Sequence, residues 1–193
     1  AASILTGTAI PGSGRNSAGA KSPLTGGYGE AESGGDWGAK LRWAGYDGLV
    51  ITGQSEKPVY LWINNSLVEL RDAAHLWGME AYETQQAVLS EIGDRRASVA
   101  VIGPGGERLI RYACIAQDMH DFLGRCGLGA VMGSKRLKAI VVNGKTRPEV
   151  AQKDEVIDTA RWMRDNYEAP LGTMQEMGTA RGVPVLNAAG GLP

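Results

Sequence analysis

The feature that most constrains the fold is a glycine-marked pattern that occurs twice at a constant separation of 91 residues. The first copy runs from Gly38-Ala39 to an apolar segment at 49–52 and Gly53. The second runs from Gly129-Ala130 to an apolar segment at 139–143 and Gly144. Each copy is typical of a glycine-rich loop, a helix and a buried strand, and two copies without a gap indicate a duplicated unit. The alternative is that two unrelated helix–strand units share glycines at their joints. The pattern predicts an α+β domain, internally duplicated and built on two sheets.

The composition excludes several classes of protein. Lys and Arg number 20 against 21 Asp and Glu, and the resulting net charge of −1 argues against nucleic-acid binding through bulk electrostatics. No apolar run approaches the ~18 residues of a membrane span. Two cysteines cannot build a disulfide framework, which is typical of a reducing, cytoplasmic environment. Because the chain starts at Ala1 without an initiator methionine, we expect a piece of a longer protein.

Local patterns predict the secondary structure. We expect a helix at about 34–44 that Ser33 caps and Gly45 ends, and a second helix at 80–92 closed by Gly93. The strands are expected at 48–52, 58–63, 67–70, 98–102, 108–116 and 137–143, of which the second and third form a hairpin. Around Pro148 the pattern changes to an amphipathic helix at 153–167. The sequence thus predicts a first domain over 1–147 and the start of a helical second domain over 148–193.

Two arginines lie beside glycines. Arg15 follows Gly12-Ser13-Gly14, and Arg125 lies in the run from Gly124 to Gly129. Glycines let a ligand approach the main chain, and a guanidinium group binds phosphate through paired hydrogen bonds. Ordinary turns with solvated arginines are an equally good explanation of the chemistry alone. Neither stretch has the spacing of the Gly-x-x-x-x-Gly-Lys-Ser/Thr phosphate loop.

Candidates for acid–base chemistry are carboxylates close to these loops, namely Glu30, Glu32, Asp118 and Asp121. A carboxylate just before a helix start is also explained by the helix dipole, which is the plainer reading of Glu32. The two histidines and two cysteines are too few and too far apart for a tetrahedral zinc site. The sequence therefore predicts neither a catalytic side chain nor a protein-only metal site.

An ordered set of motifs resembles one family. The set comprises Gly14-Arg15, Ala20–Gly26, Ser33-Gly34-Gly35, Ala44–Gly53, Ser55–Tyr60, Ile102-Gly103-Pro104 and Gly127–Lys135. In this order it resembles the tungsten-containing aldehyde:ferredoxin oxidoreductases, nearly continuously to Gly144 and more loosely to the end of the chain. The specificity lies in the order of the motifs, since none of them is decisive alone.

The resemblance implies a domain that forms the base of a bis-molybdopterin tungsten cofactor. The positions that match cofactor contacts in the family are Arg15, Glu32, Gly34, Asp121, Phe122, Gly124 and Arg125. The parent enzyme would oxidise aldehydes to carboxylic acids and pass electrons through a [4Fe–4S] cluster to ferredoxin. In the family, the cluster cysteines and the substrate pocket lie outside the part that this chain matches. The resemblance leaves open whether the protein forms a homo-oligomer. We expect the Gly34 and Gly127 regions to lie on one side of the domain, with Arg15 and Arg125 beside them.

Two departures from the family pattern are carboxylates. Glu32 stands where well-known members have Asn, and Asp121 where they have Arg, so side-chain contacts to cofactor phosphates are in doubt at both positions. The loop containing Cys126 is similar to the tungsten subunits of aryl-CoA-reducing enzymes, which is an alternative within the family. Further alternatives are a non-catalytic module for a phosphate-bearing ligand and a purely structural domain. A Cys-x-x-Cys-x-x-x-Cys motif downstream in the parent reading frame would favour the oxidoreductase.

Overall fold

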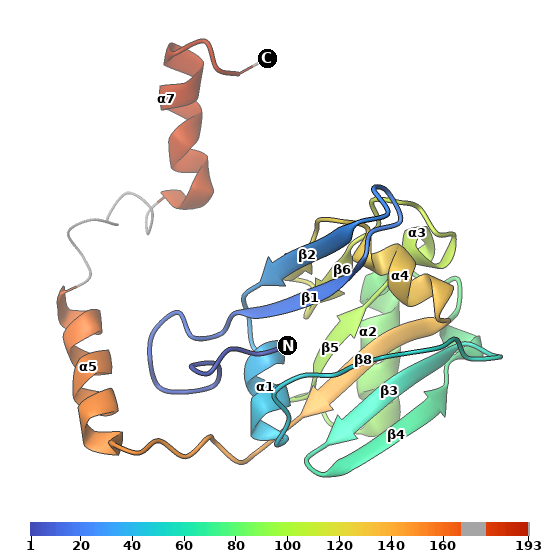
Figure 1. The fold of residues 1–193 in the computed structure, drawn as a ribbon, viewed down its shortest axis with the longest axis horizontal. Coiled ribbons are helices and arrows are strands. Elements are labelled where there is room, and N and C mark those ends of the chain that lie inside the picture. Colours follow the sequence, from blue (N-terminus) through green and yellow to red (C-terminus); the bar gives the residue numbers. More distant parts are fainter. Residues whose placement is uncertain (167–176, 193) are drawn as a thin grey trace. The chain divides into compact units, whose positions relative to one another are not determined.

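The computed structural model describes residues 1–166 and 177–192. The chain divides into two compact units, one of Ala1–Thr8 with Gly12–Glu149 and one of Ala9–Pro11 with Val150–Pro193. Figure 1 shows the ribbon with its element labels. Within the described residues, no helix has both the length and the apolar character that crossing a membrane requires.

The first unit contains two sheets. Its elements are β1 (Asn16–Lys21), β2 (Tyr28–Ser33), α1 (Trp37–Trp43), β3 (Val59–Asn64), β4 (Leu67–Asp72), η1 (Ala74–Leu76), α2 (Ala81–Ile92), β5 (Ser98–Val101), α3 (Pro104–Glu107), β6 (Ile115–Gln117), β7 (Asp121–Leu123), α4 (Leu128–Ser134) and β8 (Leu137–Asn143). Strands β1 and β2 pair with each other, and the other six form a sheet in the order β4-β3-β8-β5-β6-β7. Every neighbouring pair is antiparallel except β3 and β8. The α+β class with two sheets is thereby confirmed.

The larger sheet has an apolar core on each face. One core lies between the sheet and α2 and includes Trp62, Val88 and Val141. The other lies beneath α1, α4 and the β1–β2 pair and includes Leu41, Met132 and Ile140. Figure 1 shows α2 on the opposite side of the sheet from α1 and α4. All seven residues of β8 are buried because this central strand has a neighbour on each side and an apolar core on each face.

The duplication is visible in the helices. Both the first and the last residue of α4 lie 91 positions after those of α1. The left-handed backbone positions around each helix also correspond, Gly35 (φ 77°) with Cys126 (φ 65°) and Gly45 (φ 95°) with Arg136 (φ 54°). The two copies therefore share a loop–helix–turn, and the left-handed Cys126 holds the place of a glycine in the first copy.

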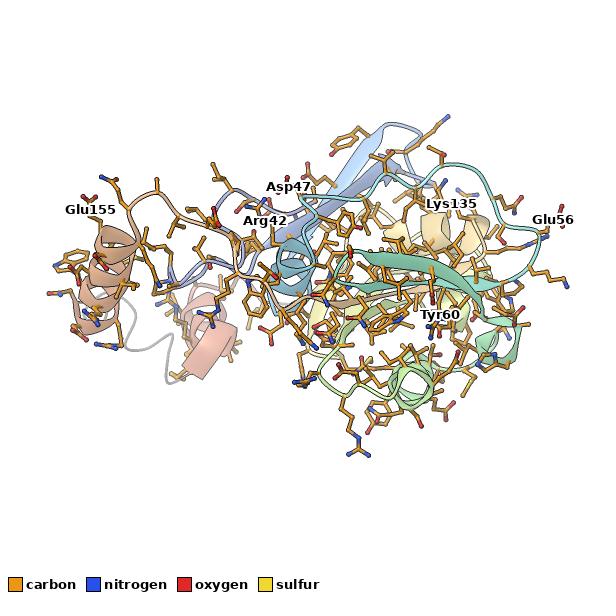
Figure 2. The ribbon with its side chains drawn as sticks, turned by 90° about the horizontal axis from the view of Figure 1, so that it is seen from below. Arg42, Asp47, Glu56, Tyr60, Lys135 and Glu155 are labelled. Atoms are coloured by element: carbon orange, nitrogen blue, oxygen red, sulfur yellow. The ribbon has the colours of Figure 1, made fainter. Side chains whose placement is uncertain are left out.

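The prediction of a strand at 48–52, in the first copy of the repeat, is wrong. Residues 48–52 form no strand, and the side chain of Val50 is 94% exposed. The corresponding β8 lies between β3 and β5, whereas residues 48–52 belong to neither sheet, and Asp47 just before them accepts a hydrogen bond from Ala2 N at 2.8 Å. Without a strand on each side the apolar run has no ladder to join. Figure 2 shows Asp47 next to Arg42 of α1, with which it forms an ion pair.

Several of the remaining elements lie where local signals predict them, whereas β1, β2 and β7 are not among the predicted strands. The hairpin, α2 with its left-handed Gly93, β5 and β8 are confirmed. The first helix starts at Trp37 instead of near Gly34, since Ser33 ends β2 and pairs with Asn16 rather than capping a helix. The strand at 108–116 is wrong, because Pro104 opens the short α3 and Leu109 turns left-handed at φ 59°, which leaves only β6.

The second unit contains α5 (Lys153–Asn166), η2 (Gly178–Arg181) and α7 (Gly182–Ala188). The predicted amphipathic helix is thus present from Lys153, and its expected last residue, 167, lies outside the described residues. Neither α5 nor α7 has a buried residue.

Candidate functional site

An open hollow on the first unit brings together most of the residues that the sequence singles out. We call it the arginine groove. It is lined by Arg15, Glu30, Ala31, Glu32, Phe122, Gly124 and Arg125, and its volume is about 680 Å³. This volume is in the range of small-molecule sites, roughly 300–1,000 Å³. The walls come from the residue before β1, from β2, and from β7 with the loop that follows it. The structure thus places Arg15 and Arg125 on the same groove although they are far apart in sequence.

The charged side chains of the groove are accessible to solvent. Arg15 Nη1 lies 3.4 Å from Glu32 Oε2, with 67% and 59% of the two side chains exposed. Solvent screens such a pair, so it contributes ~0–1 kcal/mol and an anion can readily replace the carboxylate. Among the residues that the structure describes, no carboxylate lies within ion-pair distance of Arg125. Arg125 is therefore the better placed of the two guanidinium groups to bind an anion.

The second carboxylate of the groove, Glu30, accepts a hydrogen bond from the neighbouring Tyr28. It alternates with Glu32 along β2, where the exposed positions recur every second residue. The Tyr28 hydroxyl donates a hydrogen bond to Glu30 Oε2 at 3.2 Å. The negative charge of Glu30 raises the pKa of Tyr28 above its usual value.

The far wall of the groove offers an aromatic side chain and open main chain. Phe122 is 49% exposed although it lies in β7. A Cβ atom added to Gly124 would meet nothing within 4 Å. A ligand can therefore approach the backbone of Gly124 directly, which a side chain at this position would hinder.

Gly34 and Asp121 do not line the groove. The carboxylate of Asp121 lies against the glycine turn, and a Cβ atom on Gly34 would be 3.3 Å from Asp121 Oδ1. Asp121 pairs in register with Gln117 at the start of β7. These two site residues are thus neighbours of each other, and five of the seven predicted positions share the groove.

The helix N-termini contribute less than the sequence suggests. The N-cap residues of α1 and α4 are Asp36 and Gly127, and neither lines the groove. At the start of α1 the indole of Trp37 is buried and donates to Ile140 O at 3.0 Å. The anion-binding capacity of the groove therefore comes from the two guanidinium groups and from loop backbone.

Cys126 is a packing residue in this arrangement. Its thiol is half-buried against the core beneath α4, and Sγ donates a weak hydrogen bond to Glu30 O at 3.5 Å. The consecutive left-handed residues Cys126 (φ 65°) and Gly127 (φ 68°) turn the chain sharply between Arg125 and α4. The 91-residue correspondence of this position to Gly35 is a sequence signal from which the left-handed turn can be found.

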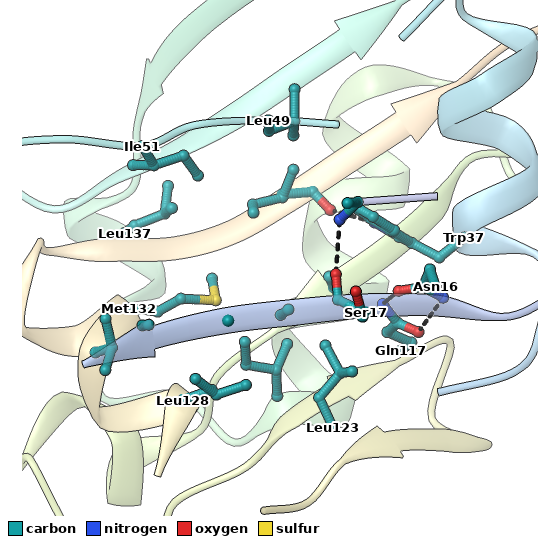
Figure 3. Close-up of a pocket in the computed structure, with 18 of the residues that line it drawn as sticks. Asn16, Ser17, Trp37, Leu49, Ile51, Gln117, Leu123, Leu128, Met132 and Leu137 are labelled. Carbon is teal, nitrogen blue, oxygen red and sulfur yellow. Dashed lines mark hydrogen bonds between the residues drawn. The ribbon is translucent and has the colours of Figure 1, made fainter. Parts of the chain in front are cut away.

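A second, apolar pocket lies beneath β1, with a volume of about 190 Å³. Figure 3 shows side chains of Leu49, Ile51, Trp37, Met132 and Leu137 around it. Two cationic groups line it: Lys135 donates to Gly53 O at 3.1 Å, and the Ala1 ammonium donates to Ser17 O at 2.6 Å. Most of its walls are hydrocarbon and belong to the core beneath α1 and α4, so this pocket is part of the core. In the part of the chain that the structure covers, no three His, Cys, Asp or Glu side chains are grouped to hold a metal ion.

Sequence reasoning does not single out Asn16 and Gln117, whose buried side-chain amides bind each other. They are 101 residues apart, so no local pattern connects them.

Comparison with known proteins gives a consistent result. The model of the aldehyde ferredoxin oxidoreductase N-terminal domain matches residues 1–144. The tungsten-containing aldehyde ferredoxin oxidoreductase of Thermococcus kodakarensis is 45% identical over 192 residues, which are 98% of this chain and 32% of that protein. The protein of the same name from Pyrococcus furiosus is 43% identical over the whole chain and 32% of its own length.

A solved structure with a similar fold is the active site complex BamBC of benzoyl coenzyme A reductase with 1,5-dienoyl-CoA. It has a TM-score of 0.79 and 40% identity, over 86% of this chain and 26% of that chain. The chain spans about a third of the length of the curated relatives named above.

Proposed function

Because this chain belongs to the aldehyde ferredoxin oxidoreductase family through its N-terminal domain, we propose that it forms one wall of a tungstopterin site in a larger oxidoreductase. The parent enzyme oxidises aldehydes to carboxylic acids with ferredoxin as the electron acceptor. Its [4Fe–4S] cluster takes its ligands from outside this chain, since Cys114 and Cys126 cannot supply four thiolates. Residues 148–193 begin its helical domain. The free thiols also support a cytoplasmic location.

The observation that carries this proposal is the arginine groove. The chemistry of its donors fits a phosphate-bearing pterin, with two exposed guanidinium groups, the open backbone at Gly124 and the aromatic side chain of Phe122. When bound, tungstopterin supplies the redox chemistry, and the protein supplies binding and orientation. Arg125 would hold a phosphate by charge-assisted hydrogen bonds, and Arg15 would exchange Glu32 for a phosphate oxygen.

Glu30 and Glu32 make the groove less basic than two arginines alone would. A carboxylate next to a phosphate raises the free energy of the complex unless a cation or proton lies between them. We propose that Glu32 keeps Arg15 pointed along the groove wall before the cofactor binds and gives up that contact afterwards.

The test is the composition and activity of the full-length protein, purified without oxygen. Inductively coupled plasma mass spectrometry should find tungsten in the protein, and oxidation of the released pterin should give its fluorescent product. Aldehyde-dependent reduction of ferredoxin should follow. A protein that binds inorganic phosphate in the groove but contains no pterin would instead be a phosphate-ligand module.

A second candidate is favoured by the similarity to the benzoyl coenzyme A reductase complex. In this case the parent would be the tungsten subunit of an aryl-CoA reductase. The same preparation distinguishes the two, because an aryl-CoA thioester with a strong reductant would then be converted while aldehydes would not.

A further inference from the structure

We propose that Asn16 and Gln117 are a positioning pair that sets the distance between the two walls of the arginine groove. This inference rests on the proposed function, since it concerns how tightly the groove holds the pterin cofactor. It gives a role to two polar side chains that contact neither the groove nor solvent.

The two side-chain amides bind each other reciprocally. Asn16 Nδ2 donates to Gln117 Oε1 at 3.2 Å, and Gln117 Nε2 donates to Asn16 Oδ1 at 2.9 Å. Asn16 is 4% exposed and Gln117 1%. Figure 3 shows both bonds, with β1 contributing Asn16 and Gln117 lying below it. A buried amide that loses its partner keeps the full cost of desolvation, so neither side chain can move away alone without penalty.

The pair lies where both walls originate. Asn16 directly follows Arg15 and pairs in register with Ser33, next to Glu32 on β2. Its Nδ2 also lies 3.4 Å from Ser33 O and from Gly34 O. The amide of Asn16 therefore ties together both segments of the first wall.

Gln117 begins the second wall. It pairs in register with Asp121, and the strand that starts there leads through Phe122 to Gly124 and Arg125. The reciprocal contact thus joins the β1–β2 pair to the six-stranded sheet, since Asn16 begins β1 and Gln117 ends β6.

The surroundings leave the pair little freedom. A Cβ atom on Gly38 would come within 2.8 Å of Asn16 Cβ, so α1 closes over this side chain. Close packing of this kind transmits a change in the length of a side chain to the backbone around it. Shortening either amide should therefore alter the spacing of Arg15 and Arg125.

The experiment uses the full-length holoenzyme and the variants Asn16→Ala, Gln117→Ala and the exchange N16Q/Q117N. The exchange keeps the total length of the two side chains and both amides. The readouts are tungsten per protein after gel filtration, the electron paramagnetic resonance spectrum of the tungsten centre and the Tm of the cofactor-free protein. We expect each alanine variant to lose tungsten about tenfold faster, as when groups behind ligand-binding residues are removed, and to shift the spectrum. The exchange should restore both.

A matched control separates positioning from general destabilisation. Val88→Ala removes buried methyl groups under α2, on the face of the sheet away from the β1–β2 pair. If Val88→Ala lowers the Tm as much as the amide variants do, it should still leave tungsten retention and the spectrum unchanged. Equal tungsten retention and an unchanged spectrum in Asn16→Ala and Gln117→Ala would overturn the inference, as would loss of tungsten in Val88→Ala to the same extent. A wild-type protein free of tungsten would overturn the proposed function itself.

Discussion

Lys138 and Glu107 form an ion pair inside the first unit, with 0% and 5% of their side chains exposed. Lys138 Nζ also donates to Met79 O at 2.8 Å, and the other oxygen of Glu107 accepts from Gly78 N at 2.8 Å. The pair thereby ties the middle strand β8 to α3 and to the loop between η1 and α2. This explains how a strand with seven buried positions accommodates a lysine.

The first prediction concerns this pair. Lys138→Met leaves a buried carboxylate without its cation and should lower the free energy of unfolding by about 3–5 kcal/mol. The double variant K138M/E107L removes both charges, and its stability should lie within about 1 kcal/mol of the wild-type chain. Urea unfolding followed by circular dichroism measures both. If the double variant is no more stable than Lys138→Met, the charge pair is not the cause.

The second prediction concerns the groove in the full-length protein. Arg125→Ala should reduce tungsten content more than Arg15→Ala, because Glu32 already occupies Arg15. A charge-assisted hydrogen bond contributes ~1.5–3 kcal/mol, so the loss on Arg125→Ala should be roughly tenfold or more. Glu32→Asn should raise retention by removing a competing negative charge. The exposed Lys57, which lies outside the groove, supplies the control Lys57→Ala. Equal effects of the Arg125, Arg15 and Lys57 variants would contradict the assignment.

The third prediction concerns the crossing of α3 and α4, where backbone meets backbone. A Cβ atom on Gly133 would lie 2.7 Å from the carbonyl carbon of Gly106, and this backbone cannot yield as a side chain can. Gly133→Ala should therefore cost about 3 kcal/mol or more. Gly105→Ala is the matched control, since nothing lies within 4 Å of its added Cβ and the position is helical. Gly105→Ala should raise the free energy of unfolding by less than ~1 kcal/mol. Thermal unfolding of the two variants, measured in parallel with the wild-type chain, tests this difference in stability.

The fourth prediction concerns pH. Burial, followed by the hydrogen bond that the Tyr60 hydroxyl donates to Glu91 Oε1 at 2.8 Å, raises the pKa of Tyr60 above 10.0. A raised pKa means that the contribution of Tyr60 to stability is complete below pH 10 and is lost as the pH rises through the higher value. Tyr60→Phe should cost about 1 kcal/mol at pH 7.

The stability difference between wild type and Tyr60→Phe should shrink above pH 10, as Tyr60 ionises in the wild type. Urea titrations from pH 7 to pH 11 measure this difference. A constant difference would show that the hydroxyl does not titrate with unfolding.

The elements that sequence analysis finds are those with local signals. The hairpin has the left-handed Asn65 at its turn, α2 ends at a left-handed Gly93, and β8 carries the apolar run 139–142. The segment 48–52 has the same apolar composition as β8 and forms no strand, because strand formation needs neighbours that composition does not reveal. In the same way, the tight turn at Leu109 depends on the packing of α3 against α4.

The residues of the candidate site also differ in whether local sequence signals reveal them. Arg15, Gly124 and Arg125 can be found because glycines beside a cation are visible in the sequence. Glu30 and Glu32 can be found as carboxylates near these loops, but the strand β2 that places both on one face is not predicted. The contact of Asn16 with Gln117 depends on the meeting of two sheets, which only the folded chain brings about.

The place of β8 in the sheet has a consequence for how the protein is made. It is the last strand of the first unit along the chain, yet it joins the β3–β4 hairpin to β5, β6 and β7. Contacts between residues so far apart in sequence form slowly, because a long loop must close first. During synthesis the hairpin can form early, but its inner edge stays open until the ribosome has released residue 143. A nascent chain that pauses before this point exposes an unpaired edge of β3, so translation speed across residues 65–143 should govern how much of the protein aggregates.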